Sequence, residues 1–119
     1  MVKLLIVDDS VFMRTVIRDI VSKDPSIEVV GTASNGLEAI EKITALEPEI
    51  ITLDIEMPKM NGIQVLEQLR KIRNRPRVLM LSSLTSKDAE LTTQAIRLGA
   101  DDFMLKPKDI PHVRNVFGF

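Results

Sequence analysis

Hydrophobic residues along the chain follow two different periods. Short apolar runs rich in β-branched residues occupy 3–7, 28–33, 49–53, 77–81 and 102–106. Runs of this length and composition are typical of β-strands. Their apolar residues are continuous rather than alternating, as they are in strands of a parallel sheet that is covered on both faces. The pattern therefore predicts buried parallel strands at these five places.

The segments between these strands carry apolar residues at helical spacing. Helices are predicted over 11–23, over 36–46, after Asn61 and before Gly99. Asn35 is placed to cap the second helix, and Gly99 is placed to end the fourth. The apolar positions are Met13, Val16, Ile17 and Ile20 in the first, Leu37, Ile40, Ile43 and Leu46 in the second, Val65, Leu69 and Ile72 in the third, and Leu91, Ala95 and Leu98 in the fourth.

Strands that alternate with helices in this way predict a doubly wound α/β fold. We expect a flavodoxin-like (βα)5 domain whose five-stranded parallel sheet has the order 2-1-3-4-5, the common solution for a small fold of this type. The last helix is expected to be short or incomplete, because 109–119 contains Pro111 and Gly118. With 119 residues and no linker or low-complexity run, the sequence predicts one domain over 1–119.

Composition removes several function classes. Lys and Arg number 16 against 17 Asp and Glu, so the chain has no excess of positive charge for binding nucleic acid. It has no cysteine for a disulfide or a thiolate metal site, and no Trp or Tyr to stack on a base or a flavin. No apolar run approaches the roughly 18 residues that cross a bilayer. We therefore expect a cytoplasmic protein without a membrane or nucleic-acid partner.

The chemistry is expected at the carboxyl ends of the strands, where ligands bind in an open α/β sheet. The first strand is followed by Asp8 and Asp9, and the third by Asp54. Neighbouring strands lie about 4.8 Å apart, so the three carboxylates would meet at one place. Like charges this close need a proton or a cation to coexist. Hard oxygen ligands of this kind suit Mg²⁺.

Further polar groups end the fourth and fifth strands. Ser82 ends the fourth, and Lys106 followed by Pro107 ends the fifth. A metal, a carboxylate, a hydroxyl and an ammonium at one edge of a sheet suit phosphoryl transfer. Asp54 is then predicted to be the nucleophile that becomes an aspartyl phosphate, while the metal and Lys106 neutralise the phosphoryl oxygens.

Each of these residues also has a simpler interpretation. Asp9 and Ser10 would only cap the first predicted helix, and a carboxylate or a lysine after a strand is often merely solvated. Met57 and Met60 are expected to pack in a loop, and His112 is expected to be solvated. The predicted site is favoured because the acids, the serine and the lysine all fall at the same edge of one sheet.

Three segments together resemble the receiver domains of two-component response regulators: LLIVDDS at 4–10, LDIEMPKMNG at 53–62 and GADDFMLKP at 99–107. The resemblance implies that Asp54 accepts a phosphoryl group from the phosphohistidine of a sensor histidine kinase. It also implies that Asp9, Asp54 and the backbone carbonyl of Glu56 ligate Mg²⁺, and that Asp8 assists through water.

The same resemblance implies roles for three residues near the ends of the last strands. Ser82 corresponds to the switch Ser or Thr, Phe103 to the aromatic switch residue, and Lys106 to the lysine that contacts the phosphoryl group. A cis peptide is implied between Lys106 and Pro107. After phosphorylation, Ser82 is expected to bond a phosphoryl oxygen and Phe103 to turn inward.

A finer similarity is to the receiver of chemotaxis protein-glutamate methylesterases, carried by SSLT at 82–85, GADDFMLKPK at 99–108 and DPSIEVVGTA at 24–33. In that subfamily the receiver masks a C-terminal esterase domain until phosphorylation, which implies a chemotaxis kinase and an esterase output as partners. No esterase domain precedes Phe119. The chain is then part of a longer protein, as we expect, or a stand-alone receiver for another output. By itself it is expected to catalyse only its own phosphorylation and dephosphorylation.

Three other classes fit parts of the pattern. A haloacid-dehalogenase-like phosphatase also uses an aspartate after an apolar strand, but it expects a second Asp where this chain has Glu56 and then Pro58. A flavodoxin-like electron carrier needs a hydroxyl- and glycine-rich phosphate loop after the first strand, which is missing. An inactive receiver used only for interaction is the last alternative, and the joint presence of the acids with Ser82 and Lys106 argues against it.

Overall fold

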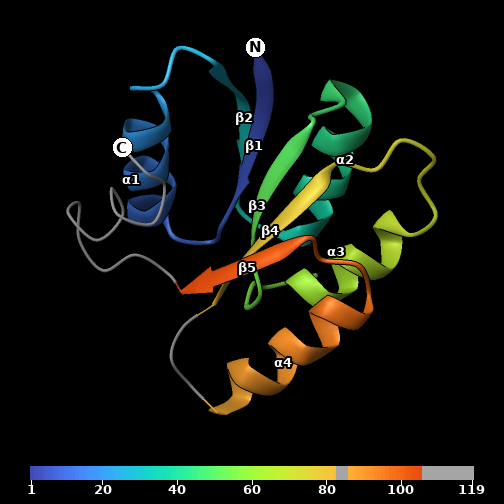
Figure 1. Cartoon of the computed structure of the whole chain (residues 1–119). Coiled ribbons are helices and arrows are strands. Elements are labelled where there is room, and N and C mark those ends of the chain that lie inside the picture. Colours follow the sequence, from blue (N-terminus) through green and yellow to red (C-terminus); the bar gives the residue numbers. More distant parts are fainter. Residues whose placement is uncertain (83–85, 106–119) are drawn as a thin grey trace.

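The computed structural model describes residues 1–82 and 86–105, which form a parallel sheet with helices on both faces (Figure 1). The strands are β1 (Val2–Val7), β2 (Ile27–Ala33), β3 (Ile50–Asp54), β4 (Arg77–Ser82) and β5 (Asp102–Leu105). Their order in the sheet is β2-β1-β3-β4-β5, which confirms the predicted topology. Residues 109–119, with the predicted last helix, lie outside the described residues.

The helices are α1 (Val11–Val21), α2 (Gly36–Leu46), α3 (Gly62–Leu69) and α4 (Ser86–Arg97). α1 ends two residues before the predicted position, because the backbone tightens there and the N–H of Lys23 bonds to the carbonyl of Ile20. Ile72 and Leu98 lie beyond the ends of α3 and α4, yet both pack against the core. The helical spacing of these two residues therefore predicted their burial correctly but not the positions at which the helices end. Within the described residues, no helix has the length and apolar character needed to span a membrane.

The predicted helix ends carry the expected caps. The side chain of Asn35 accepts a hydrogen bond of 2.9 Å from the backbone N–H of Glu38 at the start of α2. Asn61 and Gln64 form a reciprocal capping box at the start of α3. Gly99 follows α4 with a φ of +102°, the left-handed conformation that a C-terminal glycine adopts without steric cost. These caps orient α2 and α3 from the edge of the sheet that carries the acids.

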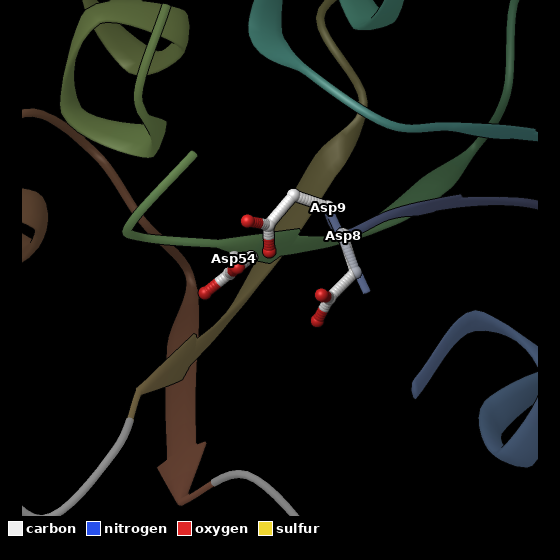
Figure 2. A group of neighbouring side chains, drawn as sticks. All are labelled: Asp8, Asp9 and Asp54. Atoms are coloured by element: carbon white, nitrogen blue, oxygen red, sulfur yellow. The ribbon is translucent and has the colours of Figure 1, made fainter. Parts of the chain in front are cut away.

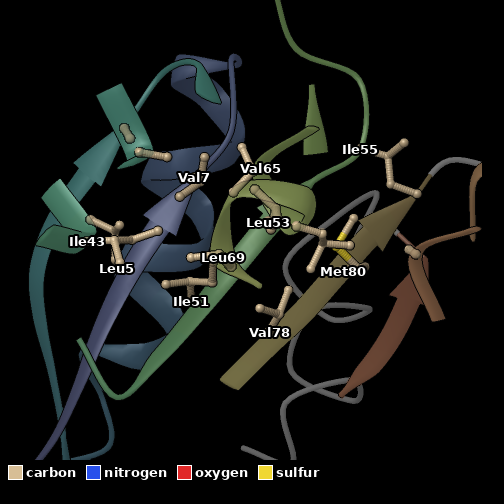
Figure 3. Packing of buried hydrophobic residues seen from close by; sticks show 14 of the residues in the cluster. Leu5, Val7, Ile43, Ile51, Leu53, Ile55, Val65, Leu69, Val78 and Met80 are labelled. Carbon is tan, nitrogen blue, oxygen red and sulfur yellow. The ribbon is translucent and has the colours of Figure 1, made fainter. Parts of the chain in front are cut away.

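Alternate residues of the central strands face two separate apolar layers. On one face, side chains of β1, β3 and β4 pack against α2, α3 and α4 (Figure 3). On the other face, Leu4, Ile6 and Leu81 pack with Ile17 and Val21 of α1. Burial on both faces is the reason that the strands read as continuous apolar runs.

Thr52 is a polar exception inside this core. It lies on β3 beside Ile6 and Leu79 of the neighbouring strands and is 1% exposed. Among the residues that the structure describes, its hydroxyl has no hydrogen-bond partner. Burying a hydroxyl in this way costs about 1–3 kcal/mol, whereas valine keeps the β-branched shape that strands favour.

Thr52→Val is therefore expected to raise the free energy of unfolding, measured by urea denaturation, by about 1 kcal/mol. Thr44→Val is the matched control, because the Thr44 hydroxyl is exposed and donates to the carbonyl of Ile40. The control should bring no such gain. A loss of stability in Thr52→Val would show that the buried hydroxyl is bonded after all.

Candidate functional site

The carboxyl ends of β1 and β3 bring three acidic side chains together (Figure 2). Val7 of β1 is the register partner of Leu53 of β3, so the residues that follow, Asp8 and Asp54, reach the same level of the sheet. A carboxylate oxygen from each of Asp8, Asp9 and Asp54 lies within 4.8 Å of the others. The predicted meeting of the three acids is confirmed, and the individual roles given to them stay predictions.

The three carboxylates differ in their exposure to solvent. Asp8 and Asp54 are 0% and 1% exposed, whereas Asp9 is exposed. Burial and like charges both disfavour the ionised form of a carboxylate, so an added cation relieves both costs. The donor set consists of oxygen atoms only, which is the chemistry that Mg²⁺ prefers. The residues at this site thus fit a hard divalent cation with an open approach from the Asp9 side.

In the turn from β1 into α1, the residue that caps the helix is not one of the three clustered acids. Ser10 is the N-cap of α1, and its hydroxyl oxygen accepts a hydrogen bond of 3.1 Å from the backbone N–H of Met13. The alternative in which Asp9 caps this helix is therefore wrong. Asp8 Oδ1 accepts from the backbone N–H of Ser10 at 2.9 Å, and Arg14 Nη1 donates to the Asp8 carbonyl at 2.6 Å. The Asp9 carboxylate is left at the surface, beside the two buried acids.

The loop between β3 and α3 is held to its surroundings by backbone hydrogen bonds. The N–H of Gly62 donates to the carbonyl of Ile55 at 2.8 Å, and the N–H of Gly36 donates to the carbonyl of Met60 at 3.0 Å. Both methionines of the loop pack against the larger apolar layer, as expected. The loop that carries Glu56 is therefore a fixed wall of the site.

A pocket of about 400 Å³ adjoins the acids. Its apolar lining comes from Ile55, Met57 and Leu91, and its polar lining from Asp9, Glu56 and Asn61. A larger pocket of about 550 Å³ lies at the opposite edge of the sheet and contains none of the predicted site residues. The smaller pocket therefore leaves open space beside the exposed carboxylate of Asp9.

The other predicted site residues are described only in part. Ser82 is the last residue of β4, next to Leu105 of β5 in the register. Phe103 lies on β5 and is 46% exposed, so it is not part of the core. Lys106 and the peptide bond before Pro107 lie outside the described residues, and so does His112.

Sequence reasoning missed three residues that support the site. Arg14 holds the carbonyl of Asp8, and its position on a helix gives no signal of this contact. Gly36 and Gly62 allow two backbone segments to approach closely, since a Cβ added at either would meet backbone atoms of Met60 or of Asp54. The sequence did contain a signal for the two glycines. Each is the first residue of a helix, directly after a capping asparagine, where alanine would stabilise the helix more than glycine does. A glycine at such a position indicates that there is no room for a side chain.

Fold and site together define a small flavodoxin-like domain with an acidic centre at its topological switch point. The comparison with known families agrees with this class, since a family model of the response regulator receiver domain matches residues 4–117. The chain therefore belongs to the response regulator receiver family, the phosphorelay modules of two-component signal transduction.

Individual relatives narrow the similarity to one branch. The protein-glutamate methylesterase/protein-glutamine glutaminase 1 of Methanospirillum hungatei is 54% identical over 118 residues, which is 99% of this chain and 34% of that protein. The crystal structure of the response regulator domain of Thermotoga maritima CheB has a TM-score of 0.87 and 44% identity, covering 99% of this chain and 90% of that one. The chain spans about a third of the length of the curated relatives that it matches.

A further structural relative comes from a complex whose name includes BeF3 and Mg. It is a chain in the CheX-CheY-BeF3-Mg complex from Borrelia burgdorferi, with a TM-score of 0.80, 34% identity, and coverage of 98% of this chain and 89% of that one. The predicted similarity to methylesterase receivers is thus confirmed, and the fold is shared with other receivers as well.

Proposed function

We propose that Asp54 is the phosphoryl acceptor of this receiver and that the phosphoryl group comes from the phosphohistidine of a chemotaxis-type sensor kinase. The observation that carries this proposal is the meeting of Asp8, Asp9 and Asp54 within 4.8 Å at the ends of two neighbouring strands. Of these acids, Asp54 is the one that belongs to a strand, and buried backbone on both sides of it restricts its motion. A restrained nucleophile is oriented before the donor arrives.

The metal ligands in this proposal are Asp9, Asp54 and the backbone carbonyl of Glu56, with Asp8 acting through water. The oxygen-only donor set supports Mg²⁺, and the Borrelia burgdorferi relative with Mg in the name of its complex agrees with that choice. When bound, Mg²⁺ supplies a positive charge that offsets the negative charge of the phosphoryl oxygens.

The transfer itself is a displacement at phosphorus by a carboxylate oxygen of Asp54. The new O–P bond forms as the P–N bond to the donor imidazole breaks, and the imidazole nitrogen keeps the electron pair of that bond. Lys106 would pair with one phosphoryl oxygen, and the Ser82 hydroxyl would donate to another. The product is an aspartyl phosphate on β3.

The signal in this proposal passes from β4 to β5. Ser82 would move toward the phosphoryl group, and Phe103 would turn inward from its half-exposed position. The surface that α4 and β5 form would change, and a methylesterase domain of a longer parent protein would respond to that change. Similarity over a third of the methylesterase relatives supports this output.

Incubation with acetyl phosphate and Mg²⁺ is expected to add one phosphoryl group to the chain. Intact-mass spectrometry measures the addition, and hydroxylamine should remove it, because it cleaves acyl phosphates. EDTA should prevent labelling, since the metal offsets charge on the phosphoryl oxygens. Labelling that is stable to hydroxylamine, or that proceeds equally in EDTA, would contradict the proposal.

A further inference from the structure

We propose that Arg14 is a positioning residue for the acidic site, because it fixes the peptide plane that connects Asp8 to Asp9. The inference rests on the proposed function, since it concerns the same metal site. Arg14 lies one turn into α1 and is half-buried, and its Nη1 donates to the carbonyl oxygen of Asp8 at 2.6 Å.

Among the hydrogen bonds that hold the chain where it leaves β1, those described for Asp8 use three different groups of that residue. The backbone N–H of Asp8 donates to the carbonyl of Ala33 at 3.0 Å, which is the last rung between β1 and β2. The N–H of Ser10 donates to Asp8 Oδ1 at 2.9 Å. Neither bond involves the carbonyl of Asp8, which is the group that Arg14 binds. Because a peptide unit is planar, fixing this carbonyl fixes the plane that leads to the Cα of Asp9.

Asp9 depends on this plane more than the other two acids do. Asp8 and Asp54 are buried, so surrounding side chains limit their motion. Asp9 is exposed, so fewer neighbouring groups restrain its carboxylate, and the direction of the backbone decides whether that carboxylate approaches the other two. The guanidinium of Arg14 thus acts on the direction of the exposed carboxylate through the backbone, by binding the carbonyl oxygen of Asp8.

The helix that carries Arg14 does not need the guanidinium for its own stability. Ser10 caps α1, and three residues of the helix are buried: Ile17, Ile20 and Val21. Removing the guanidinium while keeping an unbranched side chain should therefore leave α1 folded. This separates the effect on the site from an effect on the fold.

The charge of Arg14 and its hydrogen bond predict opposite changes in Mg²⁺ affinity when the guanidinium is removed. A positive charge near three carboxylates repels Mg²⁺, so its loss by itself would tighten metal binding. Loss of the hydrogen bond frees the plane before Asp9 and would weaken binding. Outer groups that orient a metal ligand typically change affinity by about 10- to 100-fold when removed. Weaker binding after loss of a nearby positive charge is therefore the signature of positioning.

The experiment compares the Mg²⁺ affinity of the unphosphorylated wild-type chain with three variants by titration calorimetry and backbone amide NMR. Arg14→Met should bind Mg²⁺ about tenfold more weakly. Arg18→Met is the matched control, because Arg18 is exposed on the same helix and its substitution also removes one positive charge. It should bind as tightly as the wild type or slightly tighter. Arg14→Lys should recover most of the affinity, because an ammonium group still donates to the Asp8 carbonyl.

Each outcome either supports or overturns the positioning role of Arg14. Equal Mg²⁺ affinities for Arg14→Met and Arg18→Met would overturn the inference, and so would loss of the helical circular dichroism signal in Arg14→Met, which would assign the guanidinium to folding. A wild-type chain that binds no Mg²⁺ and accepts no phosphoryl group would instead overturn the proposed function. In that case the backbone amide resonance of Asp9 still reports on the contact between Arg14 and the Asp8 carbonyl. Relative to the metal-free wild type, this resonance should shift in Arg14→Met and keep its position in Arg18→Met. An unshifted resonance in Arg14→Met would count against the role of Arg14.

Discussion

Asp54→Asn is expected to abolish phosphorylation by acetyl phosphate and at the same time to stabilise the folded domain. An amide has the size of the carboxylate but does not provide the anionic oxygen that attacks phosphorus, so no aspartyl phosphate can form. The same change removes one of three like charges within 4.8 Å of one another. Two unit charges at that distance repel by about 1 kcal/mol even in a medium as polar as water, so the free energy of unfolding of the metal-free protein should rise by about that amount.

Glu56→Gln is the matched control for this prediction. It also exchanges a carboxylate for an amide in the same part of the chain, but Glu56 is exposed and is expected to serve through its backbone carbonyl. The control should still accept a phosphoryl group, with little change in urea denaturation. Labelling of Asp54→Asn at the wild-type level would remove Asp54 as the acceptor. Lower stability in that variant would show that the buried carboxylate is held by favourable contacts that outweigh the repulsion.

The sheet and the place of the site were predictable because each follows from a local pattern. Continuous apolar runs required strands covered on both faces, and helical spacing between them required parallel connections. In such a sheet the carboxyl ends of neighbouring strands share one edge. Asp8 and Asp54 therefore had to meet, although each lies in a different third of the chain, and the register of Val7 with Leu53 confirms it.

Other features of the site were not predictable, because they depend on contacts between distant segments. Adjacent acids such as Asp8 and Asp9 look alike in the sequence, and only the alternation at the end of β1 decides that the first is buried and the second exposed. The bond from Gly36 to Met60 joins two loops that no local pattern pairs. The apolar residues Ile72 and Leu98 suggested longer helices, whereas the helices end before them and the side chains pack from the following turns.

Gly62→Ala is expected to damage both stability and phosphorylation. A Cβ at this position would lie 2.5 Å from the carbonyl oxygen of Asp54 and 3.0 Å from the Cα of Ile55. Both are backbone atoms of the segment that presents the acceptor, so neither can move aside as a flexible side chain would. Alanine favours a helix over glycine by up to about 1 kcal/mol, but forcing a group into filled space typically costs about 1–3 kcal/mol. At the first residue of α3 the propensity gain is small, so the clash dominates.

The sizes of the changes in stability and in labelling rate depend on which atoms move to relieve the clash with the new Cβ. The free energy of unfolding of Gly62→Ala, measured in urea, should fall by about 2 kcal/mol. Relief of the clash displaces the backbone of Asp54, and a misplacement of about 1 Å can slow a positioned reaction by about 100-fold, so the rate of labelling by acetyl phosphate should fall steeply. Gly31→Ala is the control, because the nearest atom to its new Cβ is the terminal Leu46 Cδ1 at 3.1 Å, on an exposed side chain that can rotate away. Gly31→Ala should keep both its stability and its labelling rate. If the two alanine variants behave alike, the close approach of α3 to the acceptor strand does not position Asp54.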